Sequence, residues 1–338
     1  MNILFVKLGA IGDAAMALSM LPAIEATYPD AHFTWMCGQI IEPLLRLYPR
    51  INELVVVNER ALFAKSKITA IREVLSVQKR MFGRHFDLVL HGNVDQRYRL
   101  LTRTVRAGET RGWHRDGLRH WPISGRYHGD EYARLITGHD PAPQPTHTLA
   151  PLKLGLPSLL QAKLNGPGKL VVLSPGGAKN ILSDSALRRW PVQSYAALAK
   201  QLADAGLRVA LIGAESDQWV LPAFTGVPVI NLIGQTTLEE LLGILGAAAA
   251  VVSHDTSCLH LARLVATPAV ALFGPTIPHE KVTGLELENL LWGGVNLPCR
   301  PCYDGAKYAG CANNLCMQSI SPEAVWQKVE KILLHKNL

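Results

Sequence analysis

The sequence predicts an α/β protein with two doubly wound halves, each a parallel sheet covered by helices on both faces. Three observations support this fold class. Short apolar segments alternate with amphipathic segments along the 338 residues, which is typical of parallel sheets. A proline-rich stretch, Pro141–Gly168, separates two such blocks. Glycine-rich turns follow several predicted strands, and ligands bind at these strand ends in doubly wound sheets.

The first block alternates in a regular way. Strands are predicted at Asn2–Leu8, Phe33–Cys37, Leu54–Val57 and Asp87–Gly92, with helices at Asp13–Tyr28, Ile40–Leu47 and Ile68–Phe82. We place an N-terminal domain at residues 1–155 and the linker at residues 156–168, within the proline-rich stretch.

The second block repeats the pattern and forms a predicted domain at residues 169–320. Strands are predicted at Lys169–Ser174, Leu207–Ile212, Val227–Leu232, Ala249–Ser253 and Pro268–Phe273. Helices are predicted around Tyr195–Leu202, at Leu238–Ala248, after Ser257 as far as Leu264, and at Ser321–Leu334. Ser321 and Pro322 are favourable residues for the start of the last helix, which belongs to the tail at residues 321–338.

Composition excludes several classes of protein. Hydrophobic residues make up 48% and charged residues 18%, which is globular rather than disordered. No apolar run reaches the length of a membrane span, and the N-terminus lacks the pattern of a signal peptide. We therefore expect a cytoplasmic protein.

The positive charge is concentrated in one segment. The formal net charge is +7, and Arg97–Arg134 holds nine arginines against four acidic residues. This favours an anionic partner, although a solvated basic face is about as good an explanation of charge alone. Trp113, Trp121 and Tyr127 interleave with the arginines, as sugar stacking or an interfacial contact would require. No nucleic-acid-binding motif is present, so we expect no nucleic-acid partner.

Several common motifs are absent. The chain has no G-x-G-x-x-G, no G-x-x-x-x-G-K-[ST], no G-x-S-x-G and no Asp-x-Asp pair. A site for a diphosphate that uses helix dipoles and basic side chains, without a metal, fits the sequence better than a metal-dependent one.

Three stretches taken together resemble one family. The first is Ile3–Asp13, the second runs from Ser174 to Lys179 and on to Arg188-Arg189-Trp190-Pro191, and the third runs from Ser253 to Thr276. In this order and spacing they resemble glycosyltransferase family 9, the ADP-heptose:lipopolysaccharide heptosyltransferases, over nearly the whole chain. The resemblance implies a GT-B fold, with two Rossmann-like domains facing across a cleft and the last helix packing back on the N-terminal domain.

The resemblance also implies an inverting transfer of a heptose-type sugar from an ADP-sugar, without a catalytic cofactor. Asp13 is implied as the catalytic base, because the acceptor hydroxyl must lose a proton as it attacks. The alternative is that Asp13 only caps its helix. The resemblance also places the acceptor on the N-terminal domain, which carries the basic segment.

The donor site is implied at the carboxyl ends of the second set of strands. Its candidate residues are Lys179, Arg188, Arg189, Glu215, Asp255, Thr256, Ser257 and His260. Lys179, Arg188 and Arg189 would face the charge that develops on the leaving diphosphate. Asp255 and Glu215 would accept hydrogen bonds from sugar or ribose hydroxyls, and the turn at Thr256 would bind phosphate through backbone N–H groups. Ser257 departs from the family pattern, which usually has glycine there. His260 is as well explained as a core histidine, Glu215 as an exposed loop acid and Asp255 as an N-cap.

Four cysteines cluster in a predicted loop at residues 297–318. Cys299, Cys302, Cys311 and Cys316 follow the pattern C-x2-C-x8-C-x4-C, which is metal-ligand spacing for zinc or iron. We expect a structural metal there; four reduced thiols are the alternative.

The partners follow from the resemblance. We expect an ADP-sugar donor and an anionic acceptor, lipid-linked at the inner membrane surface and most simply the lipopolysaccharide inner core. A protein or another glycan as acceptor is the first alternative, and a sugar-nucleotide epimerase or hydrolase with the same fold is the second. A non-catalytic ligand-binding protein is a third. The sequence does not predict the oligomeric state.

Overall fold

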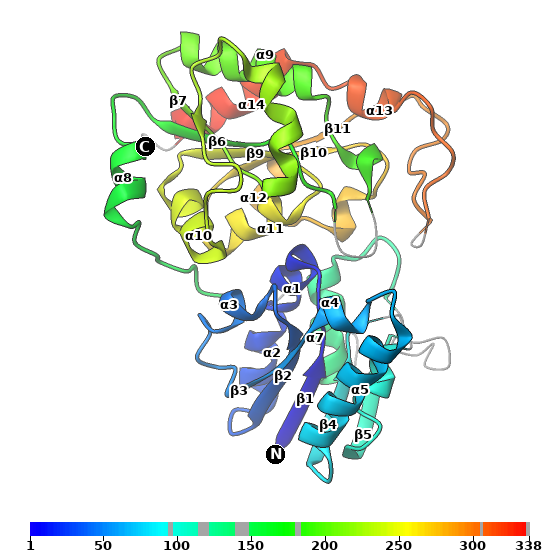
Figure 1. Ribbon diagram of the computed structural model, residues 1–338. Coiled ribbons are helices and arrows are strands. Elements are labelled where there is room, and N and C mark those ends of the chain that lie inside the picture. Colours follow the sequence, from blue (N-terminus) through cyan, green and yellow to red (C-terminus); the bar gives the residue numbers. More distant parts are fainter. Residues whose placement is uncertain (94–96, 114–121, 139–148, 180–183, 305–306, 336–338) are drawn as a thin grey trace. The chain divides into compact units, whose positions relative to one another are not determined.

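The computed structural model describes the chain except residues 94–96, 114–121, 139–148, 180–183, 305–306 and 336–338. Its contacts divide the chain into two units, Met1–Leu149 and Ala150–Leu338. Within the described ranges, no helix is both long and apolar enough to cross a membrane. Each unit is built on its own parallel sheet (Figure 1).

The N-terminal unit has a five-stranded parallel sheet in the order β3-β2-β1-β4-β5. The strands are β1 (Asn2–Val6), β2 (His32–Gly38), β3 (Glu53–Val57), β4 (His85–His91) and β5 (Arg106–Gly112). The central strand β1 pairs with both β2 and β4. This is the order of a Rossmann-type half, and its switch point lies between β1 and β4.

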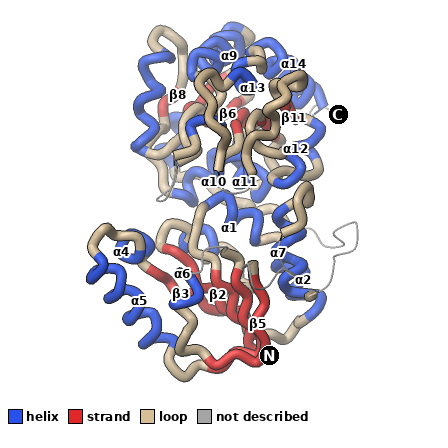
Figure 2. Tube along the Cα trace, turned by 90° about the vertical axis from the view of Figure 1, so that its right-hand side faces the viewer, coloured by secondary structure: helices blue, strands red, loops and turns tan. Residues whose placement is uncertain are grey.

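Helices cover both faces of this sheet (Figure 2). On one face α1 (Ile11–Ala17) and α2 (Met20–Thr27) contact α7 (His128–Thr137). Phe5 and Trp35 meet edge to face on that side, with ring centroids 4.8 Å apart. On the other face α5 (Lys67–Met81) buries Val77 and Met81 in a core with Val6 and Val89. The short helices are α3 (Glu42–Leu45), α4 (Glu59–Leu62) and α6 (Arg97–Leu100).

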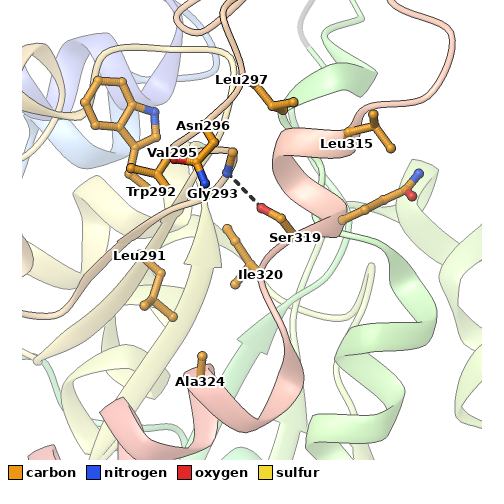
Figure 3. Close-up of a pocket in the computed structure, with 12 residues that line it drawn as sticks. Leu291, Trp292, Gly293, Val295, Asn296, Leu297, Leu315, Ser319, Ile320 and Ala324 are labelled. Atoms are coloured by element: carbon orange, nitrogen blue, oxygen red, sulfur yellow. Dashed lines mark hydrogen bonds between the residues drawn. The ribbon is translucent and has the colours of Figure 1, made fainter.

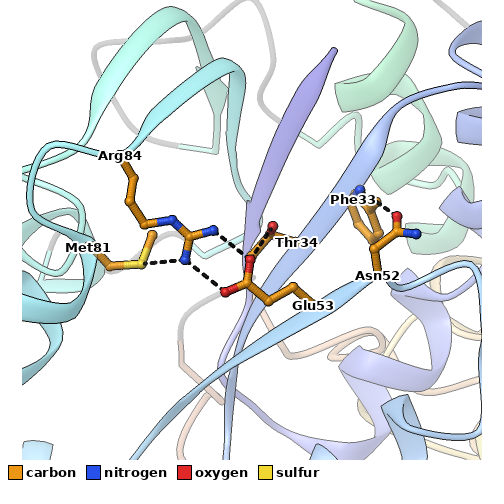
Figure 4. A network of polar contacts seen from close by, with 6 residues as sticks. All are labelled: Phe33, Thr34, Asn52, Glu53, Met81 and Arg84. Carbon is orange, nitrogen blue, oxygen red and sulfur yellow. Dashed lines mark hydrogen bonds and ion pairs between the residues drawn. The ribbon is translucent and has the colours of Figure 1, made fainter.

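A polar network stabilises the pairing of β2 with β3 (Figure 4). Arg84, in the turn between α5 and β4, donates to both carboxylate oxygens of Glu53, at 2.8 and 2.5 Å. Thr34, on the neighbouring strand β2, donates to the same carboxylate at 3.2 Å. The Arg84 hydrogen bond holds the pKa of Glu53 below its usual value although burial opposes the shift. The network therefore ties β2, β3 and the end of α5 together.

Two elements of this unit differ from the sequence prediction. The single helix expected at Asp13–Tyr28 is two helices, with a break at Leu18 and Ser19. The Ser19 hydroxyl donates to the Met16 carbonyl at 2.6 Å, a local bond that competes with the helical pattern. Strand β5 was not predicted because it is a polar, largely exposed edge strand without apolar alternation.

The C-terminal unit has a six-stranded parallel sheet in the order β11-β10-β9-β6-β7-β8. The strands are β6 (Leu170–Ser174), β7 (Arg208–Leu211), β8 (Ile230–Asn231), β9 (Ala250–His254), β10 (Ala269–Phe273) and β11 (Leu290–Trp292). Read from β8, this is the full Rossmann order, and the switch point lies between β6 and β9. Four central strands are completely buried or nearly so, because both faces are covered.

The helices of this unit lie on the two faces of its sheet. One face is covered by α9 (Val192–Asp204), the 3-10 segment Glu215–Phe224, α13 (Leu315–Gln318) and α14 (Pro322–His335). The remaining helices are α8 (Ser158–Leu164), α10 (Leu238–Ala247), α11 (Ser257–Leu264) and α12 (Leu285–Glu288).

The predicted C-terminal helix is α14, and it packs within the C-terminal unit. Its apolar residues Val325, Val329 and Ile332 are buried in the core of the C-terminal unit, and α14 contacts α9, β9 and β10. This apolar face completes the core of its own unit. Packing of the last helix against the N-terminal domain, which the resemblance implies, stays a prediction.

The expected linker at residues 156–168 contains helix α8, which buries Leu160 and Leu164. The contact boundary lies earlier, between Leu149 and Ala150. Prolines flank α8 without entering it, so the helix was hidden among turn-forming residues.

Candidate functional site

Several of the predicted functional residues lie at the switch point of their sheet. In the N-terminal unit the turn after β1 leads into α1, which carries Asp13. In the C-terminal unit β6 and β9 are neighbours, and Ser174 is in register with Ser253. The turns that follow these two strands hold the predicted donor residues. Such switch points are where open α/β sheets bind ligands.

Asp13 lies in the first turn of α1, and its side chain is 44% exposed. The Lys7 ammonium, only 5% exposed, donates to Asp13 Oδ2 at 2.8 Å. The cap position of α1 is Ala10, without a side-chain cap hydrogen bond, so Asp13 does not occupy the cap position. A neighbouring ammonium favours the ionised carboxylate, which is the form that can accept a proton.

A second carboxyl group, that of Glu59, lies close enough to Lys7 to be affected by its charge. It was not predicted from the sequence. Glu59 begins α4 and is 6% exposed. Burial raises the pKa of Glu59 to about 7, against the opposing attraction of Lys7. A Cβ at Gly9 would lie 2.8 Å from a carboxyl oxygen of Glu59, and a Cβ at Gly38 would lie closer still. The glycines therefore make room for a buried acid beside Lys7.

In the C-terminal unit, the turn after β6 carries the predicted donor residue Lys179 and is here called the donor turn. It is held by a carboxylate that was not predicted. Asp217 is buried and accepts from the backbone N–H groups of Gly177 and Ala214, both at 2.9 Å. Gly177 has a φ of +80°, and a Cβ there would lie 3.3 Å from the Thr256 methyl. Asp217 thus links the turn after β6 to the turn after β7, while Gly177 allows the turn after β9 to approach.

Thr256 is the N-cap residue of α11, and Ser257 is its first residue. The Thr256 hydroxyl hydrogen-bonds to the Ser253 hydroxyl, 3.1 Å away, rather than capping the helix. Since Thr256 occupies the cap position, the alternative of Asp255 as N-cap is wrong. The first N–H groups of a helix are a favourable site for phosphate oxygens.

Arg188 and Asp255 form a pair beside this helix start. Arg188 Nη1 lies 3.4 Å from Asp255 Oδ2, and Asp255 also accepts from the Thr276 hydroxyl at 2.9 Å. Burial alone would raise the pKa of Asp255, but Arg188, Lys281 and His260 outweigh it and lower the pKa. Asp255 is therefore an ionised, buried carboxylate with basic groups around it.

The two histidines near Asp255 have different surroundings. His254 is buried, and its Nδ1 lies 3.0 Å from the Tyr195 hydroxyl. Burial and the nearby Arg188 lower the pKa of His254 to about 3, so the ring is neutral. His260 is buried in α11 close enough to Asp255 to affect the pKa of that carboxyl.

Three other predicted donor residues lie in the segments that follow β6 and β7: Lys179, Arg189 and Glu215. Lys179 is exposed and forms a β-bridge with Asp184. The Arg189 guanidinium donates to the Gly177 carbonyl at 2.9 Å, pairs with Asp184 and lies over the Trp219 ring. Glu215 is exposed at the start of its 3-10 segment. Arg189 therefore supports the donor turn.

Part of the basic segment has a structural role. Arg126 and Arg134 both pair with the buried Glu131, at 3.0 and 2.6 Å. Arg111 pairs with Glu109 and donates to carbonyls at the end of α7. Trp113 is buried against Tyr132, with ring centroids 4.3 Å apart, which excludes the expected sugar-stacking role for it. Arg115, Arg119 and Trp121 lie outside the described residues.

The four clustered cysteines line one pocket of about 230 Å³. Burial raises the pKa of Cys302 and Cys316, and nearby cysteines raise both further. Among the residues that the structure describes, however, no group of three or more His, Cys, Asp or Glu side chains is arranged to hold a metal ion. The expected metal centre is therefore not formed in this arrangement of the loop.

A neighbouring cavity of about 650 Å³ lies beside β11 and α13 (Figure 3). It is largely apolar, and the Gly294 N–H donates to the Ser319 hydroxyl at 2.8 Å at its edge. None of the predicted site residues lines it. The cavity is therefore separate from the donor turn.

Comparison with known proteins relates the chain to one family. Residues 145–312 match the model of glycosyltransferase family 9 (heptosyltransferase). The chain is 28% identical to lipopolysaccharide heptosyltransferase 2 of Salmonella typhimurium over 306 residues, covering 82% of this chain and 84% of that protein.

Solved structures share the fold. The ADP-heptose lps heptosyltransferase II of Escherichia coli superposes with a TM-score of 0.70 and 21% identity, over the whole of both chains. The iron-containing dodecameric glycosyltransferase TibC of enterotoxigenic E. coli gives a TM-score of 0.63 at 12% identity, covering 99% of this chain and 76% of that one. With the two Rossmann-ordered sheets, these likenesses confirm the predicted GT-B fold. The chain is therefore a glycosyltransferase, similar to glycosyltransferase family 9.

Proposed function

We propose that this chain transfers a heptose-type sugar from an ADP-sugar to a hydroxyl group of an anionic saccharide, the lipopolysaccharide inner core. The observation that carries the catalytic part is the half-exposed Asp13 carboxylate, held by the buried Lys7 at the end of β1. The relatives that match the chain are heptosyltransferases, which favours transfer to an acceptor over epimerisation or hydrolysis.

The residues of the chain suit an inverting displacement. Asp13 takes the proton from the acceptor hydroxyl as the oxygen attacks the anomeric carbon. The bond between that carbon and the diphosphate breaks on the opposite face, and ADP leaves with the electron pair. The first N–H groups of α11 and the Arg188 guanidinium stabilise the charge on the diphosphate.

The remaining donor contacts are assigned by position. Asp255, which is buried and ionised beside Thr276, accepts hydrogen bonds from sugar hydroxyls. Lys179 and Arg189 add positive charge near the diphosphate, Ser257 lies at the start of α11, and Glu215 lies where ribose hydroxyls bind in related sheets. His260 acts through Asp255.

The acceptor is proposed to be lipid-linked and reached at a membrane surface. Support comes from the charge of the N-terminal unit, in which Arg99, Arg103 and Arg106 are exposed on and after α6. Phosphorylated core saccharides and anionic lipids both complement such a surface.

Thermal melting with a panel of nucleotides tests this function. A ligand at about 100 times its dissociation constant adds about 2.7 kcal/mol to the free energy of unfolding, which shifts the melting temperature clearly. We expect a shift with ADP and an ADP-sugar, and a much smaller one with UDP, GDP or CDP. A shift with UDP or GDP alone would contradict the ADP-sugar assignment while leaving the family intact.

A structural metal in the cysteine loop is a further part of the proposal. Four thiols line one pocket, and thiolates are ligands for zinc and iron. A small closure of the loop around an ion would bring the cysteines together, and the metal would supply crosslinks to a loop without a core of its own. The related TibC, which is iron-containing, has the same fold.

Metal analysis of the purified, dialysed protein tests the loop. We expect about one zinc or iron per chain, retained in Cys37→Ala and lost in Cys299→Ser/Cys302→Ser. Cys37 lies on β2 of the N-terminal unit, so this variant controls for the loss of a thiol elsewhere. Growth in metal-supplemented medium gives the site every chance to fill. A protein that then holds less than a tenth of an equivalent of either metal would refute the site.

A further inference from the structure

Helix α5 exposes an apolar stripe on its outer face. Ile68, Ile71, Leu75 and Phe82, just past the end of the helix, are 64%, 56%, 57% and 77% exposed. At 3.6 residues per turn, the first three lie within a sector of about 60°. Large side chains exposed singly need no explanation, but an aligned group on one helix marks an interaction surface.

The opposite face of α5 already has a partner. Val77 and Met81 are buried against the sheet, and Val74 packs against the same core. The exposed stripe therefore does not stabilise the N-terminal unit. By the helical period it lies on the face opposite Val77 and Met81.

Basic residues flank the stripe. Arg72 and Lys79 lie on the same outer face as Ile68 and Leu75, and Lys65, Lys67 and Arg80 are exposed around it. The one acid of α5, Glu73, is turned toward the preceding segment and accepts from the Asn58 N–H at 2.9 Å. The outer face thus combines apolar side chains with positive charge.

We propose that this surface, the α5 patch of Ile68, Ile71, Arg72, Leu75, Lys79 and Phe82, docks the enzyme on an anionic lipid bilayer. A helix with apolar residues flanked by lysine and arginine is the arrangement that lies in a membrane interface, with the apolar side chains below the headgroups. The basic residues meet the anionic headgroups. A protein partner would be favoured by acidic and basic residues in alternation, but the outer face of α5 carries no acid.

The patch deepens the proposed function on which it rests, because it names the surface that meets the membrane of a lipid-linked acceptor. Docking requires neither donor nor turnover. Vesicle binding therefore tests the patch separately from the nucleotide melt that tests the function.

The experiment is co-sedimentation of the full chain with vesicles of phosphatidylcholine and phosphatidylglycerol in equal parts, and with vesicles of phosphatidylcholine alone. We expect binding to the anionic vesicles that weakens at high salt. Ile71→Gln/Leu75→Gln should weaken it at least about tenfold, because two apolar side chains no longer enter the interface. Arg72→Gln/Lys79→Gln should weaken it by about tenfold or more on anionic vesicles.

Two matched variants test whether the loss of any two exposed leucines or lysines is enough to weaken binding. Leu159→Gln/Leu334→Gln removes two exposed leucines of the C-terminal unit, and Lys153→Gln/Lys331→Gln removes two exposed lysines there. Both should bind as wild type does. All four variants change exposed side chains, so their melting temperatures should match that of the wild type.

Several outcomes would overturn the patch. The wild type could fail to bind anionic vesicles, the patch variants could bind as strongly as the wild type, or the control variants could lose as much binding as the patch variants. Each of these results would exclude the α5 patch as the docking surface. A wild-type dimer that Ile71→Gln/Leu75→Gln converts to a monomer, without vesicle binding, would assign the surface to self-association instead. Loss of vesicle binding with retained transfer to a delipidated, water-soluble acceptor is the expected signature.

Discussion

Asp13→Asn is expected to lower the rate of sugar transfer by about 10²–10⁴-fold, the usual contribution of a general base. Asparagine keeps the size of the side chain but cannot accept the proton of the acceptor hydroxyl. The measurement is ADP release from an ADP-sugar in the presence of lipopolysaccharide core. Binding of the ADP-sugar, followed by thermal shift, should persist because the proposed donor residues lie in the C-terminal unit.

The control for this variant is Asp30→Asn, which changes an exposed aspartate after α2. It should retain wild-type turnover. The Asp13→Asn substitution leaves the buried Lys7 without its carboxylate partner, so the melting temperature of the variant must be measured as well. A folded Asp13→Asn protein that turns over within about threefold of wild type would exclude Asp13 as the base, since a general base contributes far more.

Arg188→Gln is expected to have the second large effect, a loss of about 10²–10³ in kcat. The guanidinium lies beside the Asp255 carboxylate and the first turn of α11, where the leaving diphosphate is proposed to lie. Its charge stabilises the departing diphosphate more than the intact donor. Steady-state ADP release at saturating donor measures kcat, and thermal shift measures donor binding.

This variant has a second readout in its pH dependence. The pKa of Asp255 is lowered in the folded state, so its contribution to stability is present above the unfolded pKa, near 4, and is lost as the pH falls through the folded value. Without Arg188 much of this contribution disappears. We expect the melting temperature of Arg188→Gln to fall further below wild type at pH 7 than at pH 3.

A matched arginine is available at the opposite end of the same sheet. Arg208 begins β7 and donates to the Gly168 carbonyl at 3.0 Å. Arg208→Gln should leave kcat unchanged. Equal losses of kcat in both variants, or an unchanged kcat in Arg188→Gln, would remove Arg188 from the transition state.

The strands and turns that carry the site could be predicted because their signals are local. Ile3–Val6 and Val171–Leu173 are short apolar runs that end in glycine-rich turns. Elements with weak local signals were missed. The polar edge strand β5 has no apolar alternation, and α8 lies among prolines. Helix α14 was predicted, but its contribution to the core of the C-terminal unit was not, since a local helix signal does not say which surface the helix covers.

Some residues of the candidate site could likewise be predicted from the sequence, and others could not. Asp13, Arg188 and Asp255 could be singled out from their motifs. Lys7 as the partner of Asp13, Glu59 beside Gly9 and Gly38, and Asp217 across the donor turn could not. Apart from the Lys7 pair, these contacts join residues that are distant in the sequence, and no local pattern marks them.

The amino-acid sequence by itself determined the alternation of strands and helices, the family, and the turns in which catalytic and donor residues are predicted. Only the tertiary structure decided which carboxylates are buried and paired, and which arginines of the basic segment form ion pairs with Glu131. It also decided that the four cysteines line one pocket without forming a metal centre among the described residues. The physical reason is that periodicity and turn chemistry depend on near neighbours. Burial and charge pairing arise when parallel strands bring distant segments to one edge of a sheet.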